Sequence, residues 1–262
     1  MSAAPEMPAT SPVSGAKALA LSATASIARV ARWERVQGWA NRPVVELAEM
    51  QPVTAEWWRE RRRVPGRFFH LALGDSTAQG IGASSPGRSY LGQLVDRTEA
   101  LIGEPVHVTN LAKSGATTAL CVENQLPRAV GPLTKNPDLV TVAIGANDIA
   151  LWNPVAFHDN ISRIFDALPP YTIVGEVPCF HLPRRELLVA EANGILRTIA
   201  ADRGLTVAPV YRATRERGVR GIVTEFAADA FHPNDRGYQV WADAFWPAVR
   251  ERVESAWPRP EA

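Results

Sequence analysis

The sequence predicts an α/β protein, a three-layer α/β/α sandwich in which helices cover both faces of a five-stranded parallel sheet. Short apolar segments alternate with longer amphipathic ones from residue 68 to residue 255. Apolar segments without strict alternation are typical of strands buried on both faces, and a regular strand–helix order indicates parallel βαβ units. The chain has 262 residues, of which 46% are hydrophobic, so it can bury a large core.

The strands are expected at 68–73, 106–111, 138–144, 171–177 and 205–210. The helices between and after them are expected at 90–102, 118–130, 155–168, 184–203 and 235–255. In sheets of this kind, sites form beyond the carboxyl ends of the strands. The residues that follow the first three strands should therefore meet, and they are Ser76, Ser114 with Gly115, and Asn147.

Residues before the first strand predict a separate N-terminal extension. Residues 1–14, rich in Ala, Ser and Pro, predict a disordered tail. Residues 15–66 predict a helical extension, with a helix over 15–37 and a second over 54–63 that Thr54 opens as N-cap. The first helix either packs on the main domain, which is expected over residues 67–257, or lies on a membrane surface.

Charge and composition exclude several classes of protein. A formal net charge of +1 offers no field for nucleic acid, and no apolar run is long enough for stable membrane insertion. Residues 18–28 resemble a signal peptide only weakly, so the cytoplasm is expected and secretion is the lesser alternative. Cys121 and Cys179 lack metal-ligand spacing and are expected to be buried free thiols.

The residues after the first strand and before the last helix offer the parts of a nucleophilic site. Ser76 ends a Gly-Asp-Ser turn, where its hydroxyl can face solvent. A hydroxyl nucleophile needs a base, and the base needs an orienting group. Asp229 precedes His232 by three residues, so its carboxylate can fold back onto one imidazole nitrogen and leave the other for Ser76. Pro233 restricts the loop that carries the histidine.

Four segments resemble the sequence blocks of GDSL/SGNH hydrolases, in the family's order and over roughly residues 68–255. They are Leu73-Gly74-Asp75-Ser76-Thr77-Ala78-Gln79-Gly80-Ile81-Gly82, Asn110-Leu111-Ala112-Lys113-Ser114-Gly115-Ala116-Thr117, Ile144-Gly145-Ala146-Asn147-Asp148, and 229–234 continuing through Gly237-Tyr238. The resemblance implies the flavodoxin-like SGNH hydrolase fold. The G-x-S-x-G elbow of α/β-hydrolases is absent around Ser76.

The resemblance also implies a role for each matched residue. Ser76 would attack the acyl carbon of a small-molecule acyl ester, His232 would act as base, and Asp229 would orient His232. The N–H groups of Ser76 and Gly115 and the side-chain amide of Asn147 would form the oxyanion hole. No cofactor and no metal are implied. Thr77 stands where many members have leucine, and Ala230 where glycine is frequent, which affects substrate fit more than mechanism.

Other polar residues have simpler explanations. His70 and His107 lie in expected strands, His158 lies in a helix, and His181 follows the fourth strand, where it could line the cleft. Asp75 and Asp148 are expected to cap or brace turns, and Asn147 could itself be a turn residue.

Two aromatic groups leave alternatives open. Trp152 and the region of Phe157 either form an apolar wall for the acyl group or simply pack. The pair Trp57-Trp58 belongs either to the core of the extension or to a cap over the cleft.

The leading interpretation is a serine esterase or lipase that cleaves acyl esters through an acyl-enzyme. An acyltransferase or a carbohydrate O-acetyl esterase would use the same triad, and a non-catalytic binding module is the third alternative. Sequence leaves the natural substrate and the oligomeric state open, because the loops that line pockets vary freely on one fold.

Overall fold

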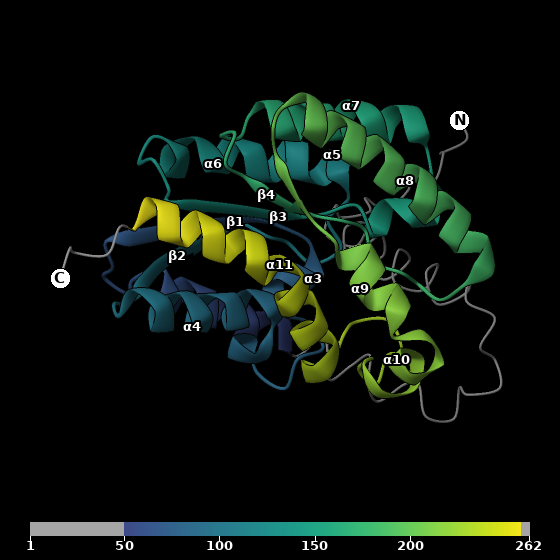
Figure 1. Ribbon diagram of the computed structural model, residues 1–262, viewed down its shortest axis with the longest axis horizontal. Helices are drawn as coiled ribbons and strands as arrows, with labels where there is room; N and C mark the ends of the chain where they lie inside the picture. The colour runs from purple at the N-terminus through teal and green to yellow at the C-terminus, as the bar shows by residue number, and fades with distance from the viewer. Residues whose placement is uncertain (1–49, 258–262) are drawn as a thin grey trace, which may run out of the picture. The chain divides into compact units, whose positions relative to one another are not determined.

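The computed structural model describes residues 50–257, which belong to one compact unit. The expected tail over 1–14 and helix over 15–37 lie outside the described residues. The unit contains a five-stranded parallel sheet in the order β2-β1-β3-β4-β5 (Figure 1), which confirms the predicted fold class. The strands are β1 (Phe68–Gly74), β2 (Val106–Asn110), β3 (Leu139–Ala143), β4 (Ile173–Gly175) and β5 (Thr206–Ala208).

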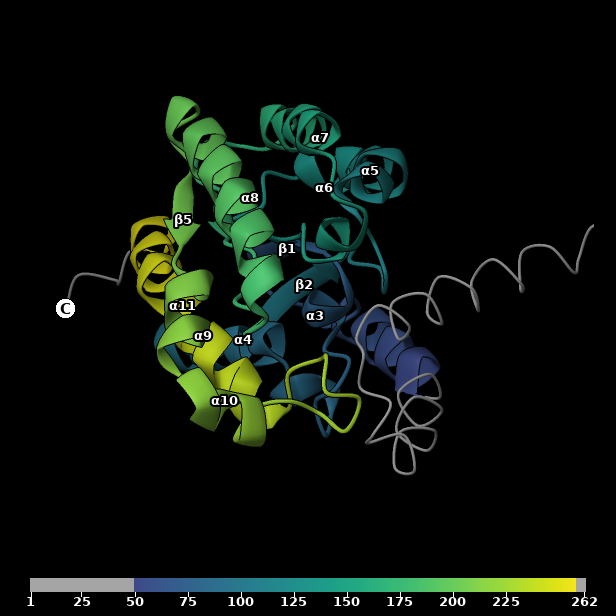
Figure 2. The same cartoon turned by 90° about the vertical axis from the view of Figure 1, so that its right-hand side faces the viewer.

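Helices cover both faces of this sheet (Figures 1 and 2), as the sequence predicts. On one face, α5 to α8 bury a cluster around Leu71, Val142 and Phe165. On the other face, α4 and α11 bury a second cluster around Phe68, Tyr90 and Phe245. The inner strand β1, between β2 and β3, is buried along its whole length, because both clusters use its side chains. The sheet order reverses between β1 and β3, and in this topology a ligand site forms beyond the ends of those two strands.

The longer helices follow the expected ranges closely, because clear caps delimit them. Ser89 caps α4, Asn153 caps α7 and Asn234 caps α11, each accepting a backbone N–H of the first turn. The helices are α3 (Ser76–Gln79), α4 (Tyr90–Ile102), α5 (Thr118–Leu120), α6 (Leu126–Leu133), α7 (Pro154–Asp166), α8 (Pro183–Asp202), α9 (Val210–Glu216), α10 (Gly218–Thr224) and α11 (Asp235–Ala256). Three further turns are η1 (Pro86–Arg88), the π-turn η2 (Cys121–Gln125) and η3 (Asn147–Leu151).

Two stretches differ from the prediction because of proline. The helix expected over 118–130 continues to Leu133 and widens into the π-turn η2, which Pro127 follows in the first turn of α6. Proline has no N–H for the helical ladder, and its ring crowds the carbonyl four residues earlier. The fifth strand ends at Ala208 rather than at residue 210, because Pro209 begins the turn into α9. Neither α9 nor α10 was predicted.

A helix over residues 50–61 precedes the sheet, and the predicted N-cap at Thr54 is wrong. The chain is already helical at Met50, and Thr54 is buried within the helix rather than opening it. Trp58 is also buried, packs with the second cluster, and donates its indole N–H to the Gln79 carbonyl at 2.9 Å. The pair Trp57-Trp58 therefore belongs to the core. None of the helices within residues 50–257 is long and apolar enough to cross a membrane.

Candidate active site

Ser76 lies in a tight turn at the carboxyl end of β1. Asp75 caps the short helix α3, accepting hydrogen bonds from the Thr77 N–H at 2.9 Å and the Thr77 hydroxyl at 2.7 Å. This confirms the capping role expected of Asp75. Ser76 is the first residue of α3, where a backbone N–H has no partner within the helix.

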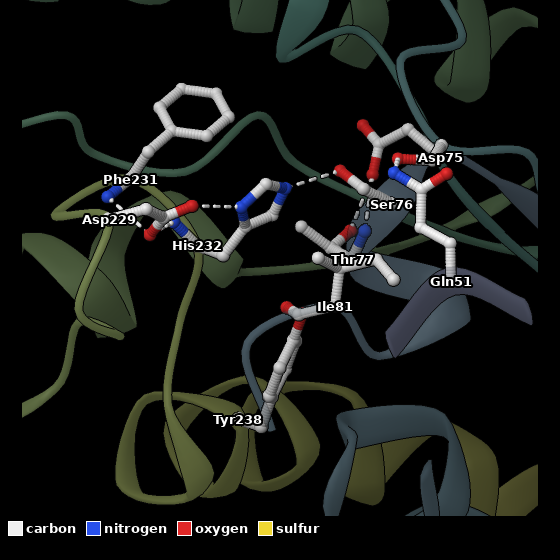
Figure 3. Close-up of polar contacts among 10 residues, drawn as sticks. Gln51, Asp75, Ser76, Thr77, Ile81, Asp229, Phe231, His232 and Tyr238 are labelled. Atoms are coloured by element: carbon white, nitrogen blue, oxygen red, sulfur yellow. Dashed lines mark hydrogen bonds and ion pairs between the residues drawn. The ribbon is translucent and has the colours of Figure 1, made fainter. Parts of the chain in front are cut away.

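A chain of hydrogen bonds joins Ser76 to the loop before α11 (Figure 3). The hydroxyl Oγ of Ser76 lies 2.9 Å from His232 Nε2, and His232 Nδ1 lies 2.5 Å from Asp229 Oδ2. Ser76 and His232 are 156 residues apart in sequence. The structure therefore brings together the three side chains that the sequence singled out, in the order serine, imidazole and carboxylate.

Backbone pairing closes the loop that carries Asp229 and His232. Phe226 and Pro233 form an antiparallel bridge, and the Ala227 N–H donates to the His232 carbonyl at 2.8 Å. The Asn234 side chain donates to the carbonyls of Thr224 and Phe226. These bonds hold the two ends of the loop together, and His232 lies at one of these ends, next to Pro233.

Two glycines of the first sequence block permit the close approach of neighbouring chain segments. A Cβ at Gly82 would lie 2.8 Å from the Cβ of His232 and 2.6 Å from the Pro233 carbonyl oxygen. A Cβ at Gly74 would lie 2.5 Å from the carbonyl oxygen of Ala143. Any larger residue at these positions would push the histidine loop or β3 away from the serine turn.

Ala230, between Asp229 and His232, adopts a left-handed conformation with φ of 54°. Such a conformation is costly for a residue with a Cβ, so glycine would fit this position with less strain. The turn lets the Asp229 carboxylate accept the backbone N–H groups of Phe231 and His232, each at 3.0 Å.

These contacts set the ionisation of the carboxylates. Burial by itself raises the pKa of Asp229, but hydrogen bonds from His232 and from two backbone N–H groups outweigh it and hold the pKa below the usual value. Burial raises the pKa of Asp75, with opposing hydrogen bonds from Thr77. Asp229 is therefore an anion at neutral pH, as the partner of an imidazole must be.

The residues predicted to form the oxyanion hole lie in the turns that follow β1, β2 and β3. Gly115 follows β2 in a left-handed conformation with φ of 73°, and within residues 50–257 the N–H groups of Ser76 and Gly115 donate to no other protein group. The Asn147 side-chain amide donates to the Ala116 carbonyl at 2.9 Å, which fixes its orientation and leaves its second N–H free. Asp148 braces the same region by accepting from the Thr118 N–H, as expected.

A pocket of about 50 Å³ opens beside Ser76, His232 and Asn147. Its walls are largely apolar and include Phe180, Phe226, Phe231 and Trp241. An apolar pocket beside a hydroxyl of this kind is the sort of site that takes the acyl group of an ester.

Of the four other histidines, only His181 lines the pocket beside Ser76. His70 is buried in β1 against the Thr141 hydroxyl, and burial lowers its pKa to about 3. His107 lies on the edge strand β2, and His158 is exposed on α7. His181 lines the pocket, as the sequence allowed, with its ring edge-on to Phe226.

The remaining alternatives concern Trp152 and the cysteines. Trp152 packs on Phe157 and donates to Glu191, and neither aromatic residue lines the pocket, so packing is their role. Both cysteines are buried free thiols, as expected, and burial raises the pKa of Cys179 to about 11. No group of three His, Cys, Asp or Glu side chains among residues 50–257 could hold a metal ion.

Sequence reasoning missed three residues around the site. Thr214 and Glu225 come from the unpredicted segment around α9 and α10, which forms part of the pocket wall. Gln51, on the helix over residues 50–61, lies with its amide 3.5 Å from the Ser114 hydroxyl, at the edge of the site shown in Figure 3. The glycines at 218 and 221 hid the helical pattern of α10, and no sequence pattern pointed to Gln51.

The fold and the site together define an α/β protein in which a serine, an imidazole and a carboxylate are in contact beyond the ends of parallel strands. The chain belongs to the GDSL-like lipase/acylhydrolase family, whose model matches residues 72–240.

Individual relatives agree with this assignment. A GDSL-like esterase of Mycobacterium tuberculosis is 27% identical over 223 residues, and the match covers 74% of this chain and 66% of that protein. The lipase/acylhydrolase from Enterococcus faecalis superposes with a TM-score of 0.59 at 23% identity, covering 74% of this chain and 100% of that chain. A family 3 carbohydrate esterase from Clostridium thermocellum gives 0.57 at 19% identity, covering 72% and 98%.

Proposed function

We propose that the protein is a serine esterase that cleaves acyl esters with a short acyl group through a covalent acyl-enzyme. Ser76 attacks the acyl carbon, and His232 takes the hydroxyl proton and returns it to the leaving alcohol. Asp229 orients His232 and stabilises its charged form. A water molecule, activated by the same histidine, then hydrolyses the acyl-enzyme.

The observation that carries this proposal is the continuous contact from Asp229 Oδ2 through the imidazole to Ser76 Oγ, with spacings of 2.5 and 2.9 Å. A base within such reach of a hydroxyl can remove its proton during attack. The anionic state of Asp229 supports its role as the orienting group.

The surroundings of the hydroxyl supply the electrostatic part of the mechanism. Attack on an ester carbonyl places negative charge on the carbonyl oxygen, which needs donors that are already in place. The N–H groups of Ser76 and Gly115 and the side-chain amide of Asn147 are the donors we assign to the oxyanion. Gly115 suits this role because its left-handed conformation turns the peptide at the end of β2.

Acetylated carbohydrates are a second class of substrate that the site supports. The pocket beside Ser76 is small and apolar, which suits an acetyl group, and one solved structure of the same fold is a carbohydrate esterase. Hydrolysis of an acetyl ester on a sugar would use the same residues. A panel of acetylated sugars beside simple alkyl acetates would separate the two classes by kcat/KM.

The free thiols favour a reducing compartment, and we propose the cytoplasm as the location.

The test of the proposed function is Ser76→Ala, measured with p-nitrophenyl acetate and butyrate and with a fluorophosphonate probe. We expect loss of labelling and a fall in kcat of at least about a thousandfold, with Ser85→Ala, an exposed serine outside the pocket, as the control. Asn147→Ala should lower kcat by about a hundred- to a thousandfold with little change in KM. A Ser76→Ala protein that hydrolyses either ester at the parent rate would refute the proposal.

A further inference from the structure

A buried amide holds the peptide that leads into the nucleophile turn. Gln125 accepts the Gly74 N–H at 3.0 Å through Oε1 and donates to the Gly74 carbonyl at 2.7 Å through Nε2. The Gln125 side chain is 1% exposed. It therefore forms hydrogen bonds with both the N–H and the carbonyl of Gly74, two residues before Ser76.

The local sequence explains why a polar side chain reaches this depth. Gln125 ends the π-turn η2, and its buried neighbours on the same helical face are the apolar Cys121, Val122 and Ala129. A buried amide without partners costs free energy, so an amide is retained on an apolar face only where it has partners. Here the partners belong to the serine turn, and π-turns often occur beside functional sites.

Gly74 is also the point where three strand ends connect. Its carbonyl accepts the Lys113 N–H at 3.2 Å, from the loop that continues to Gly115. The next residue, Asp75, donates its N–H to the Ala143 carbonyl at the end of β3, just before Asn147. A movement of the Gly74 peptide would displace Ser76 relative to both proposed oxyanion donors.

We propose that Gln125 is a positioning residue for the ester hydrolysis, which fixes the Gly74 peptide and thereby aligns Ser76 with His232 and the oxyanion donors. This inference rests on the proposed function. Gln125 lies outside the pocket and touches no reacting atom, so it acts only through the backbone it holds. Misalignment of reacting groups by about 1 Å can cost about a hundredfold in rate.

The chain contains a matched control for this arrangement. Asn193 on α8 is equally buried and holds Val177 in the same two-bond manner, accepting its N–H at 2.8 Å and donating to its carbonyl at 2.9 Å. Val177 follows β4 and is remote in sequence from the serine turn. A variant at Asn193 removes a comparable buried amide without touching Gly74.

The decisive variant is Gln125→Glu. A neutral glutamic acid keeps one donor and one acceptor for Gly74, whereas the carboxylate loses the donor and faces the Gly74 carbonyl with a negative charge. Asp75, next to Gly74, and Asp148 of η3 are the carboxylates that act on Cys121, which lies one turn before Gln125. The ratio of variant to parent kcat at each pH removes the contributions that are the same in both proteins.

We expect this kcat ratio to lie within about threefold of one at low pH and to fall at least about tenfold as the introduced carboxyl ionises, with KM for p-nitrophenyl acetate little changed. Burial should raise the pKa of that carboxyl, so the fall should lie between about pH 5 and 9. Asn193→Asp should lower thermal stability over the same range, while its kcat per folded molecule stays within about threefold of the parent.

Two outcomes would overturn the inference. One is a kcat ratio for Gln125→Glu that stays flat with pH while the fraction of folded protein is constant. The other is an equal loss of kcat per folded molecule in Gln125→Glu and Asn193→Asp, which would make the bonds to Gly74 purely structural. Ser76→Ala, assayed alongside, separates this failure from that of the proposed function, since only the latter leaves Ser76→Ala active.

Discussion

Asp229 contacts His232 twice within one turn of the chain. Its Oδ2 lies 2.5 Å from the imidazole Nδ1, and its Oδ1 accepts the backbone N–H of the same histidine at 3.0 Å. The carboxylate therefore fixes both the ring and the backbone that carries it. An imidazole held in this way keeps a single orientation, in which Nε2 faces the Ser76 hydroxyl.

Asp229→Asn separates these two contacts. Asparagine keeps an oxygen that can accept the backbone N–H groups, but its amide would donate an N–H to Nδ1 of His232. The imidazole proton would then lie on Nε2, which could no longer accept the proton of Ser76. We expect kcat to fall by roughly a thousand- to ten-thousandfold with thermal stability nearly unchanged. The control is Asp235→Asn, which removes an acid three residues after His232 that accepts hydrogen bonds from Ser84. A kcat within tenfold of the parent would contradict the role of Asp229.

Ala230→Gly tests the strained turn between the acid and the histidine. A left-handed residue with a Cβ costs about 1–2 kcal/mol, whereas glycine in the unfolded chain costs about 0.5–1 kcal/mol. The variant should therefore be as stable as the parent or up to about 1.5 kcal/mol more stable, with unchanged kcat. Ala230→Val should be less stable than either protein. Denaturant unfolding of all three proteins measures the differences, and a clear loss of stability in Ala230→Gly would contradict the assigned strain.

His70 predicts how stability depends on pH. Burial lowers its pKa to about 3 in the folded protein, against about 6.5 in the unfolded chain. Between these values the unfolded state binds the extra proton, so this stabilisation is complete above pH 6.5 and is lost as the pH falls toward 3. The slope should approach 1.4 kcal/mol per pH unit. His70→Gln, which can still bond Thr141, should show a shallower slope in urea unfolding between pH 6 and 4, and equal slopes would contradict the assignment.

Phe226→Ala tests the size limit of the pocket. Phe226 lines the pocket and packs edge-on against His181, so truncation should open room for longer acyl chains. We expect the kcat/KM ratio of p-nitrophenyl hexanoate to acetate to rise by about tenfold or more. Trp152→Ala removes an aromatic ring that packs outside the pocket and should leave the ratio unchanged. A rise of equal size in both variants would argue against the pocket as the acyl site.

The sequence predicted most of the fold because buried strands and the apolar faces of helices are local signals. The helix expected over 90–102 has those bounds in the structure, and the one expected over 235–255 ends one residue later. One rule about parallel sheets led to the expectation that Ser76, Gly115 and Asn147 meet, and the structure places Ser76 and Asn147 on one pocket.

What the sequence did not reveal depends on distant partners. The pocket wall around α10 could not be predicted, because Gly218 and Gly221 weaken its helical pattern and its position depends on the Arg217–Glu225 ion pair. Threonine is a residue type that favours N-cap positions, but Thr54 lies buried inside a helix, where packing outweighs this local preference. Gln125 was visible as a polar residue on an apolar face, yet nothing in its own segment pointed to Gly74.

The bond from the Trp58 indole to the Gln79 carbonyl has a practical consequence for anyone shortening this protein. Gln79 ends the same four-residue helix that Ser76 begins, and the family match starts only at residue 72. An expression fragment that begins at residue 72 would lack Trp58. The carbonyl of Gln79, at the end of the helix that Ser76 begins, would lose its hydrogen bond from the indole, and the apolar surface that Trp58 covers would become exposed. The segment upstream of the sheet is thus a structural part of the catalytic unit and belongs in any minimal version of it.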